Sequence, residues 1–217
     1  MANPSSSEDS TGQERHGLLL VICGPSGVGK TTITRRLVEH YDAVFSVSAT
    51  TRPRTKADEP GRDYHFVSED EFLQLIDQQA LLEHALVFGN RYGTLRAPVE
   101  SSLRAGRVVV LEIDVQGALQ VREQLPEAFL VFILPPAEST LLDRLRARKR
   151  EPEDRIQARF REAKREITVA KESGAYDMFV VNDDLERAVA EIAHAVDAVM
   201  VGGGRVPTSP ESRENMG

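Results

Sequence analysis

Residues 24–31 constrain the fold more than any other segment, because they read Gly-Pro-Ser-Gly-Val-Gly-Lys-Thr and match the pattern G-x-x-x-x-G-K-[ST]. An apolar run at 18–23 precedes the pattern, and a helix-compatible segment at 31–41 follows it. A glycine-rich turn between a strand and a helix lets backbone N–H groups surround a phosphate at the positive end of the helix. Lys30 adds a full positive charge, and the Thr31 hydroxyl is placed to bind a magnesium ion that bridges phosphates. The sequence therefore predicts a nucleoside triphosphate site.

Short apolar runs alternate with helical patterns through most of the chain. Strands are expected at 18–23, 108–111, 129–134 and 178–181. Helices are expected at 31–41, 97–105, 115–124, 138–150, 153–172 and 184–200. Such alternation indicates an α/β fold of the P-loop NTPase type, a parallel sheet covered by helices on both faces. Ligands of such sheets bind at the carboxyl ends of the strands.

Residues 44–96 break this alternation. Short strands are expected at 44–48, 64–67 and 82–88, and a helix is expected at 69–78. The helix start, Ser68-Glu69-Asp70-Glu71, has the pattern of a capping box. We therefore expect a small mixed α+β insertion, about residues 46–96, beside the nucleotide site. Its hydroxyl and guanidinium groups after the first strand predict a second anion site.

Charge and composition restrict the partners and the compartment. The net charge of −7 argues against general nucleic-acid binding, yet residues 144–165 hold ten Lys or Arg against four acids. This excess predicts a local anionic ligand, with a merely solvated helix face as the alternative. The only cysteine, Cys23, lies in an apolar run, and no apolar stretch approaches the ~20 residues that span a bilayer. A cytoplasmic protein without membrane contact is expected, with disordered tails at 1–16 and 202–217.

Six ordered blocks of the chain resemble the guanylate kinase family. They lie at 24–31, 46–52, 61–67, 88–94, 111–117 and 181–185. The resemblance extends over about 17–201 and implies transfer of the γ-phosphoryl group of ATP to GMP, with Mg²⁺ as cofactor. Use of dGMP and the choice between monomer and homo-oligomer stay open. The implied substrates are ATP and GMP, with no nucleic-acid or membrane partner.

The resemblance also implies roles for individual residues. The ATP-binding positions are Gly24, Pro25, Ser26, Gly27, Val28, Gly29, Lys30, Thr31, Thr32 and Asn182. The guanine-reading positions are Ser48, Glu83, Thr94 and Asp114, and the clamp on the GMP phosphate comprises Arg52, Tyr64 and Tyr92. The catalytic cations are Lys30 and three arginines of a helical lid at about 138–165, namely Arg144, Arg148 and Arg159. Thr31 and, more weakly, Glu112 are the expected magnesium ligands.

The chemistry of guanine agrees with these roles, although each residue has a structural alternative. Guanine presents N–H donors at N1 and N2, which suit a carboxylate, and an acceptor at O6, which suits a hydroxyl. Alternatively, Glu83 is a solvent-facing strand residue, Tyr92 a packed aromatic ring, and Glu112 a capping partner in a loop. The run 182–184, Asn-Asp-Asp, also has the pattern of a helix N-cap.

The segment after Arg52 departs from the family pattern, which has a second phosphate-binding arginine three residues after the first. Thr55 stands at that position here. We expect Arg54 to replace the missing arginine, then Lys56 in order of preference, and a clamp with one arginine as the last option.

Two other functions compete with this interpretation. A guanylate-kinase-like interaction module is one, but such modules characteristically lack a functional phosphate loop, whereas residues 24–31 are complete. A phosphotransferase acting on another nucleotide or on a phosphorylated sugar is the other. Glu83 and Asp114 argue against a sugar, because a sugar gives no reason for a guanine-reading pair of carboxylates.

Overall fold

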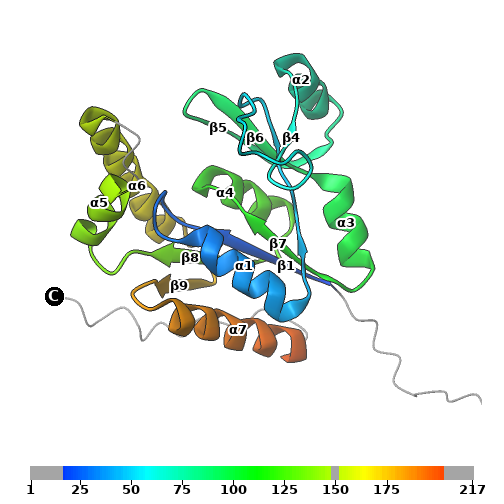
Figure 1. The fold of residues 1–217 in the computed structure, drawn as a ribbon. Helices are drawn as coiled ribbons and strands as arrows, with labels where there is room; N and C mark the ends of the chain where they lie inside the picture. The colour runs from blue at the N-terminus through cyan, green and yellow to red at the C-terminus, as the bar shows by residue number, and fades with distance from the viewer. Residues whose placement is uncertain (1–16, 148–151, 203–217) are drawn as a thin grey trace, which may run out of the picture.

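The computed structural model describes residues 17–147 and 152–202, so Arg148 and nearly all of both tails lie outside the described residues. The main sheet contains β1 (Leu18–Cys23), β2 (Val44–Phe45), β7 (Val108–Glu112), β8 (Phe129–Leu134) and β9 (Met178–Val181). Its order is β2-β7-β1-β8-β9, and every pairing is parallel (Figure 1). The neighbours of β1 come later in the chain on both sides. Such a switch in strand order opens a crevice at the carboxyl ends of the strands.

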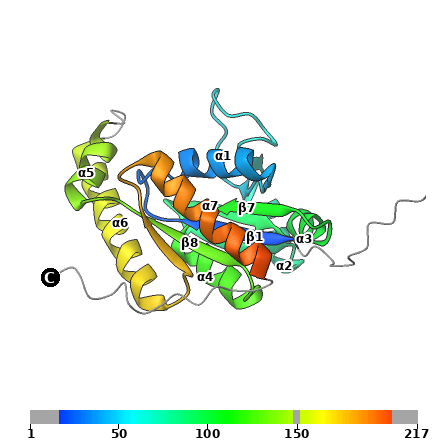
Figure 2. The same ribbon diagram turned by 90° about the horizontal axis from the view of Figure 1, so that it is seen from below.

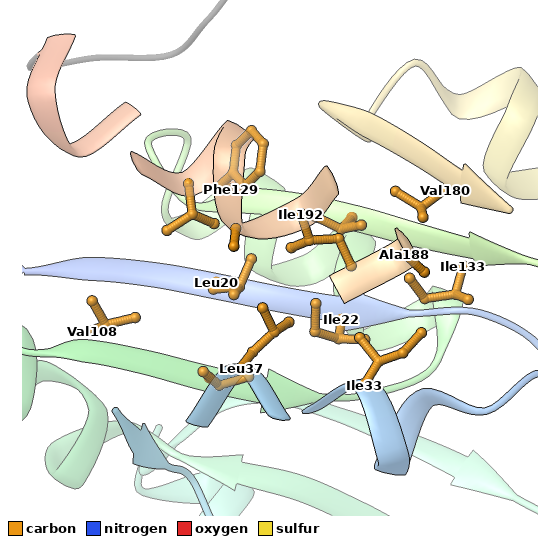
Figure 3. Packing of buried hydrophobic residues seen from close by; sticks show 14 of the residues in the cluster. Leu20, Ile22, Ile33, Leu37, Val108, Phe129, Ile133, Val180, Ala188 and Ile192 are labelled. Atoms are coloured by element: carbon orange, nitrogen blue, oxygen red, sulfur yellow. The ribbon is translucent and has the colours of Figure 1, made fainter. Parts of the chain in front are cut away.

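The main sheet is buried on both faces, which explains the unbroken apolar run of β1. Leu20 and Ile22 face α1 (Lys30–Tyr41) and α7 (Leu185–Gly202), and Figure 3 shows them packed beside Ile33 and Ile192. Figure 2 shows α7 lying across β1 and β8. The alternate residues of β1 pack toward three further helices. These are α3 (Arg96–Arg104), α4 (Val115–Gln124) and α6 (Glu153–Ser173). The α/β fold with helices on both faces is confirmed.

A second, mixed sheet occupies the expected insertion. It contains β3 (Ala49–Thr50), β4 (His65–Phe66), β5 (Leu81–Val87) and β6 (Asn90–Leu95), in the order β4-β3-β6-β5. Helix α2 (Glu69–Asp77) begins at Ser68 with the expected capping box, in which Ser68 and Glu71 bond each other's backbone N–H. In Figure 1 this sheet and α2 lie above α4, while α5 (Glu138–Ala147) and α6 lie at the left of the view.

Two strand expectations in the insertion were wrong. The strand expected at 44–48 ends at Phe45, and Val44–Phe45 pairs with β7 of the main sheet. A separate strand, Ala49–Thr50, follows and pairs with β6 of the insertion. The strand expected to include Phe88 ends at Val87 instead. Phe88 and Gly89 have φ of 47° and 82°, the positive values of a two-residue hairpin turn, and β6 follows immediately. This hairpin turn brings β6, a strand with no apolar alternation, against β5.

A buried ion pair joins helix α4 to the part of the main sheet that contains β8 and β9. Arg122 of α4 bonds Asp177, whose Oδ2 also accepts the N–H of Leu130 at 2.9 Å. The Asp177 side chain is 1% exposed and that of Arg122 is 14% exposed. The pair thus joins α4, β8 and the segment before β9.

We predict that Asp177→Ala lowers the free energy of unfolding by about 3–5 kcal/mol, because it leaves the Arg122 charge without its partner in a mostly buried position. Urea denaturation checks this. As the control, Glu59→Ala removes the exposed Arg62–Glu59 pair and should cost less than about 1 kcal/mol. Equal costs in the two variants would contradict the role given to burial.

Candidate active site

The phosphate loop crosses the carboxyl end of the main sheet between β1 and α1. Gly29 has φ of 105°, and a Cβ there would lie 2.5 Å from Asn182 Nδ2, so no side chain fits. Asn182 is buried and its Nδ2 donates to the carbonyl oxygen of Val28 at 2.8 Å. The Asn182 side chain therefore holds the loop from beneath. The helix cap also expected in this run is Asp184, whose Oδ1 accepts the N–H of Arg187 at 2.8 Å.

A polar hollow lies on the other side of the phosphate loop. Its lining residues are Ser26, Gly27, Gly29, Lys30, Thr31, Thr32 and Glu112. Lys30 Nζ donates to the carbonyl oxygens of Gly24 at 2.5 Å and Pro25 at 3.2 Å. All but one of the lining residues come from the loop and the first turn of α1. The hollow thus gathers most of the positions expected to bind ATP.

The two expected magnesium ligands meet in this hollow. Thr31 Oγ1 donates to Glu112 Oε1 at 2.8 Å, and Glu112 ends β7 beside β1. Within residues 17–147 and 152–202, no group of three or more His, Cys, Asp or Glu side chains is arranged to hold a metal ion. Magnesium fits such a site nonetheless, because it commonly takes one or two protein oxygens and completes its shell with phosphates and water.

Two of the three expected lid arginines contact the phosphate loop directly. Arg144, in the last turn of α5, donates to the carbonyl oxygens of Val28 at 3.1 Å and Asn182 at 3.2 Å. Arg159 of α6 donates to Ser26 Oγ. Other cations of the basic run form exposed ion pairs, among them Arg146 with Glu153. The exposed ion pairs fit a solvated helix face for part of the run, whereas an anionic ligand for Arg144 and Arg159 stays a prediction.

The insertion carries a second polar site, centred on Glu83. Glu83 of β5 faces Thr94 of β6, and Thr94 Oγ1 donates to Glu83 Oε1 at 2.6 Å. The side chains are buried, with Glu83 4% exposed and Thr94 fully enclosed. The alternative of a solvent-facing Glu83 is wrong. Burial raises the pKa of Glu83 to about 7, and the negative charge of Asp114 adds to the rise while the Thr94 hydrogen bond opposes it.

Asp114 and Ser48 have backbone partners that the sequence analysis did not foresee. Asp114 Oδ1 accepts the N–H of Gly117 at 2.9 Å and caps the start of α4. Ser48 lies half-buried before β3, and its carbonyl oxygen accepts the N–H of His65 at 2.9 Å. The Asp114 carboxylate thus has a structural task in addition to any contact with a ligand.

The three residues of the expected phosphate clamp lie together in the insertion. The guanidinium carbon of Arg52 is 5.3 Å from the centre of the Tyr64 ring. The Tyr64 and Tyr92 rings meet edge to face, 5.7 Å apart. Tyr92 is half-exposed, so it packs on Tyr64 without being enclosed. An arginine and two phenols on one patch suit a phosphate group.

Asp58, a residue that no sequence pattern singled out, organises the loop after Arg52. Its carboxylate accepts from both terminal nitrogens of Arg52, at 2.8 and 3.2 Å, and from Thr55 N at 2.6 Å and Thr55 Oγ1 at 2.7 Å. Hydrogen bonds from Arg52 and Thr55 hold the pKa of Asp58 well below its usual range. Arg54 donates through Nε and Nη2 to the Asp58 carbonyl oxygen, each at 3.3 Å. Arg54, the exposed arginine preferred as the second cation of the clamp, is therefore hydrogen-bonded within the same loop as Arg52 and Asp58.

Comparison with known proteins decides the family. The sequence model described as Guanylate kinase matches residues 16–199. Guanylate kinases of Lactobacillus delbrueckii and Anaeromyxobacter dehalogenans are 47% and 48% identical to this chain, over 88% and 86% of its length and 93% and 83% of theirs. The crystal structure of guanylate kinase from Anaplasma phagocytophilum superposes with a TM-score of 0.68 at 34% identity, covering 88% of each chain. The chain belongs to the guanylate kinase family.

Guanylate kinases are nucleoside monophosphate kinases, so this chain is an enzyme rather than a peptide-binding module. The hollow beside the complete phosphate loop and the buried Glu83–Thr94 pair are two separate polar sites of this chain. Among the helices of the described ranges, none combines the length and the apolar character that crossing a membrane requires. A kinase of this family uses ATP, generally with Mg²⁺.

The buried Glu83 of this guanylate kinase gives a prediction about stability and pH. Its pKa is raised from 4.5 to about 7 in the folded protein. A raised pKa contributes stability that is present below about pH 4.5 and is lost as the pH rises through about 7. Glu83→Gln removes the charge and keeps an acceptor for Thr94. We predict that the variant unfolds with the wild-type free energy near pH 4 and is more stable by on the order of 3 kcal/mol at pH 8.5.

Thermal or urea unfolding at the two pH values checks this prediction. Glu71→Gln is the control, since the Glu71 carboxyl is exposed and its pKa is lowered by the hydrogen bonds from Ser68. That variant should lose stability at high pH instead of gaining it. A Glu83→Gln variant with no pH-dependent gain would contradict the raised pKa.

Proposed function

We propose that the two sites serve one reaction, in which the γ-phosphoryl group of ATP is transferred to GMP to give ADP and GDP. The observation that carries this proposal is the hollow lined by Lys30, Thr31 and Glu112, in a chain that belongs to the guanylate kinase family. Arg52, Tyr64 and Tyr92 lie together in the insertion as the proposed clamp for the acceptor phosphate. Burial is the main cause of the raised pKa of Tyr64, and the negative charge of Glu112 adds to it, which supports a clamp near the hollow. An acceptor phosphate on the clamp would then lie near a donor phosphate in the hollow.

The phosphate loop and the arginines around it form the ATP side. Lys30 Nζ, which bonds the carbonyl oxygens of Gly24 and Pro25, would turn to the β- and γ-phosphates. Thr31 and Glu112 would hold Mg²⁺, which neutralises charge on the phosphates when it is bound. Arg144 and Arg159 lie against the loop already and stabilise the negative charge that develops between donor and acceptor. Arg148 completes this set in our proposal and lies outside the described residues.

The insertion reads guanine when the hydrogen bond between Thr94 and Glu83 is exchanged for bonds from both residues to the base. Ionised Glu83 accepts from guanine N1–H and the N2 amino group, and Asp114 and Ser48 add contacts at the edge of the base. Thr94 has a single hydroxyl proton, which Glu83 now receives. Because the base supplies Glu83 with new donors, the Thr94 proton becomes available for O6. Adenine carries no N1–H and no O6, so it satisfies neither group.

Replacement of Lys30 by Met tests the ATP side. We predict a folded protein whose turnover with ATP and GMP falls by several orders of magnitude, because the loop loses its charge on the transferred phosphate. Lys171→Met, an exposed change near the end of α6, is the control and keeps wild-type turnover. A coupled assay for ADP release measures both, with GMP, AMP, UMP, CMP and dTMP offered in turn. Equal use of all five nucleotides, or near-native turnover of Lys30→Met, would contradict the proposal.

The second cation of the phosphate clamp is tested by a pair of variants. We propose that Arg54 supplies it, because Arg54 is fixed to the loop that holds Arg52. Arg54→Ala should raise the KM for GMP by roughly 10- to 150-fold, the effect of about 1.5–3 kcal/mol for one charged contact, with the KM for ATP unchanged. Lys56→Ala, two residues away, should leave both constants at wild-type values. The reverse result would assign the contact to Lys56, and no effect in either would leave a clamp with one arginine.

A further inference from the structure

We infer that two residues of α4, Gly117 and Gln120, position Glu83 for guanine reading. The inference rests on the proposed function, since it concerns the carboxylate assigned to guanine. Neither residue is expected to touch the nucleotide. Both lie where α4, a helix of the main domain, packs against β5, the edge strand of the insertion that carries Glu83.

Gly117 provides the space that the Glu83 carboxylate occupies. A Cβ on Gly117 would lie 2.3 Å from Glu83 Oε2 and 2.9 Å from Glu83 Cδ, well inside contact distance. Glu83 is 4% exposed and its other oxygen is held by Thr94, so the carboxylate has little room to move away from a methyl group at position 117. Gly in a helix costs roughly 1 kcal/mol relative to Ala. Close packing with Glu83 explains a glycine at this helical position.

The backbone of Gly117 also fixes the second guanine-reading carboxylate. Its N–H donates to Asp114 Oδ1 at 2.9 Å. Gly117 therefore lies against both carboxylates of the proposed guanine site. Its lack of a side chain leaves room for Glu83, and its N–H bonds Asp114. A shift of α4 at Gly117 would change the distance between Glu83 and Asp114.

Gln120, almost one turn further along α4, fixes the strand itself. Its Nε2 donates to the carbonyl oxygen of His84 at 2.8 Å, and its Oε1 accepts the N–H of His84 at 3.1 Å. His84 follows Glu83 in β5, and the side-chain amide bonds both of its backbone groups as a neighbouring strand would. Edge strands otherwise leave such groups unpaired. Gln120 thus holds β5, and with it Glu83, in a fixed position against α4.

Kinetics of three single variants test this inference. Gly117→Ala should raise the KM for GMP by at least 10-fold and lower the preference for GMP over AMP, because the new methyl group displaces the Glu83 carboxylate. Gln120→Ala should raise the KM for GMP several-fold. Both variants should keep the wild-type KM for ATP. Gln116→Ala, an exposed change on the same helix, is the matched control and should leave every constant unchanged.

A double-variant cycle separates positioning of Glu83 from a general effect on the helix. Glu83→Ala removes the side chain that would collide with a methyl group at position 117. In that background, Gly117→Ala should not raise the KM for GMP further, so the two effects should be strongly non-additive. Fully additive effects would overturn the inference. If Gly117→Ala alone does not fold, a folded double variant supports the collision, and if neither folds, Gln120→Ala decides.

Failure of the inference and failure of the proposed function give different results. Wild-type protein that transfers no phosphoryl group to GMP would overturn both. Wild-type activity on GMP, together with unchanged GMP constants and selectivity in Gly117→Ala and Gln120→Ala, would overturn the inference alone. In that case Gly117→Ala should only show the greater stability expected when alanine replaces glycine in a helix.

Discussion

The shape of the phosphate loop depends on how the carbonyl group of Val28 is bonded. Asn182, which follows β9, and Arg144, in the last turn of α5, both donate to this one oxygen. Val28 is fully buried and does not line the hollow, whereas Gly27 and Gly29 on either side of it do. A loop that binds anions must turn its carbonyl oxygens away from the ligand and its N–H groups toward it. Asn182 and Arg144, which are distant in sequence, thus hold the negative end of the Val28 carbonyl dipole away from the hollow.

Two carboxyl groups, those of Glu83 and Glu166, have raised pKa values to which the negative charge of Asp114 contributes. Burial is the main cause that raises the pKa of Glu166, on α6, to about 7, while the positive charge of Lys30 lowers it and the negative charge of Asp114 raises it. Asp114 also raises the pKa of Glu83 in the insertion. Lys30 bonds the loop carbonyls, and its charge also acts on Glu166 of α6. The electrostatics around the loop therefore depend on Asp114 and Glu166 as well as on Lys30.

Local patterns were sufficient to predict the main sheet and the loop from the sequence. Residues 18–41 encode a strand, a glycine turn and a helix in one continuous stretch, so burial and backbone conformation both follow from neighbours in the chain. Strand β6 was missed because its sequence, Asn-Arg-Tyr-Gly-Thr-Leu, has no apolar alternation, and its pairing follows from a turn at Phe88 and Gly89. The family resemblance identified Glu83 and Thr94, but their burial and mutual hydrogen bond became visible only with the hairpin register.

Contacts between distant segments could not be predicted in the same way. Asn182 lies 154 residues from Val28, and no local pattern distinguishes a side chain beneath the loop from a helix cap. Asp58 was missed for a different reason, since an exposed-looking acid in a loop rich in polar residues carries no signal of its own. Its partner Arg52 was expected to bind phosphate, and an arginine suited to phosphate also suits an internal carboxylate.

The Arg52–Asp58 pair changes the charge that the phosphate clamp offers. Arg52 contributes one positive charge and Asp58, held ionised by its hydrogen bonds, contributes one negative charge beside it. The pair alone is neutral, whereas a nucleotide phosphate carries close to two negative charges at neutral pH. Tyr64 and Tyr92 provide hydrogen-bond donors but no charge. A second cation would therefore matter more in this chain than with an unpaired Arg52, and Arg54, our proposed replacement for the family's second arginine, lies in the same loop.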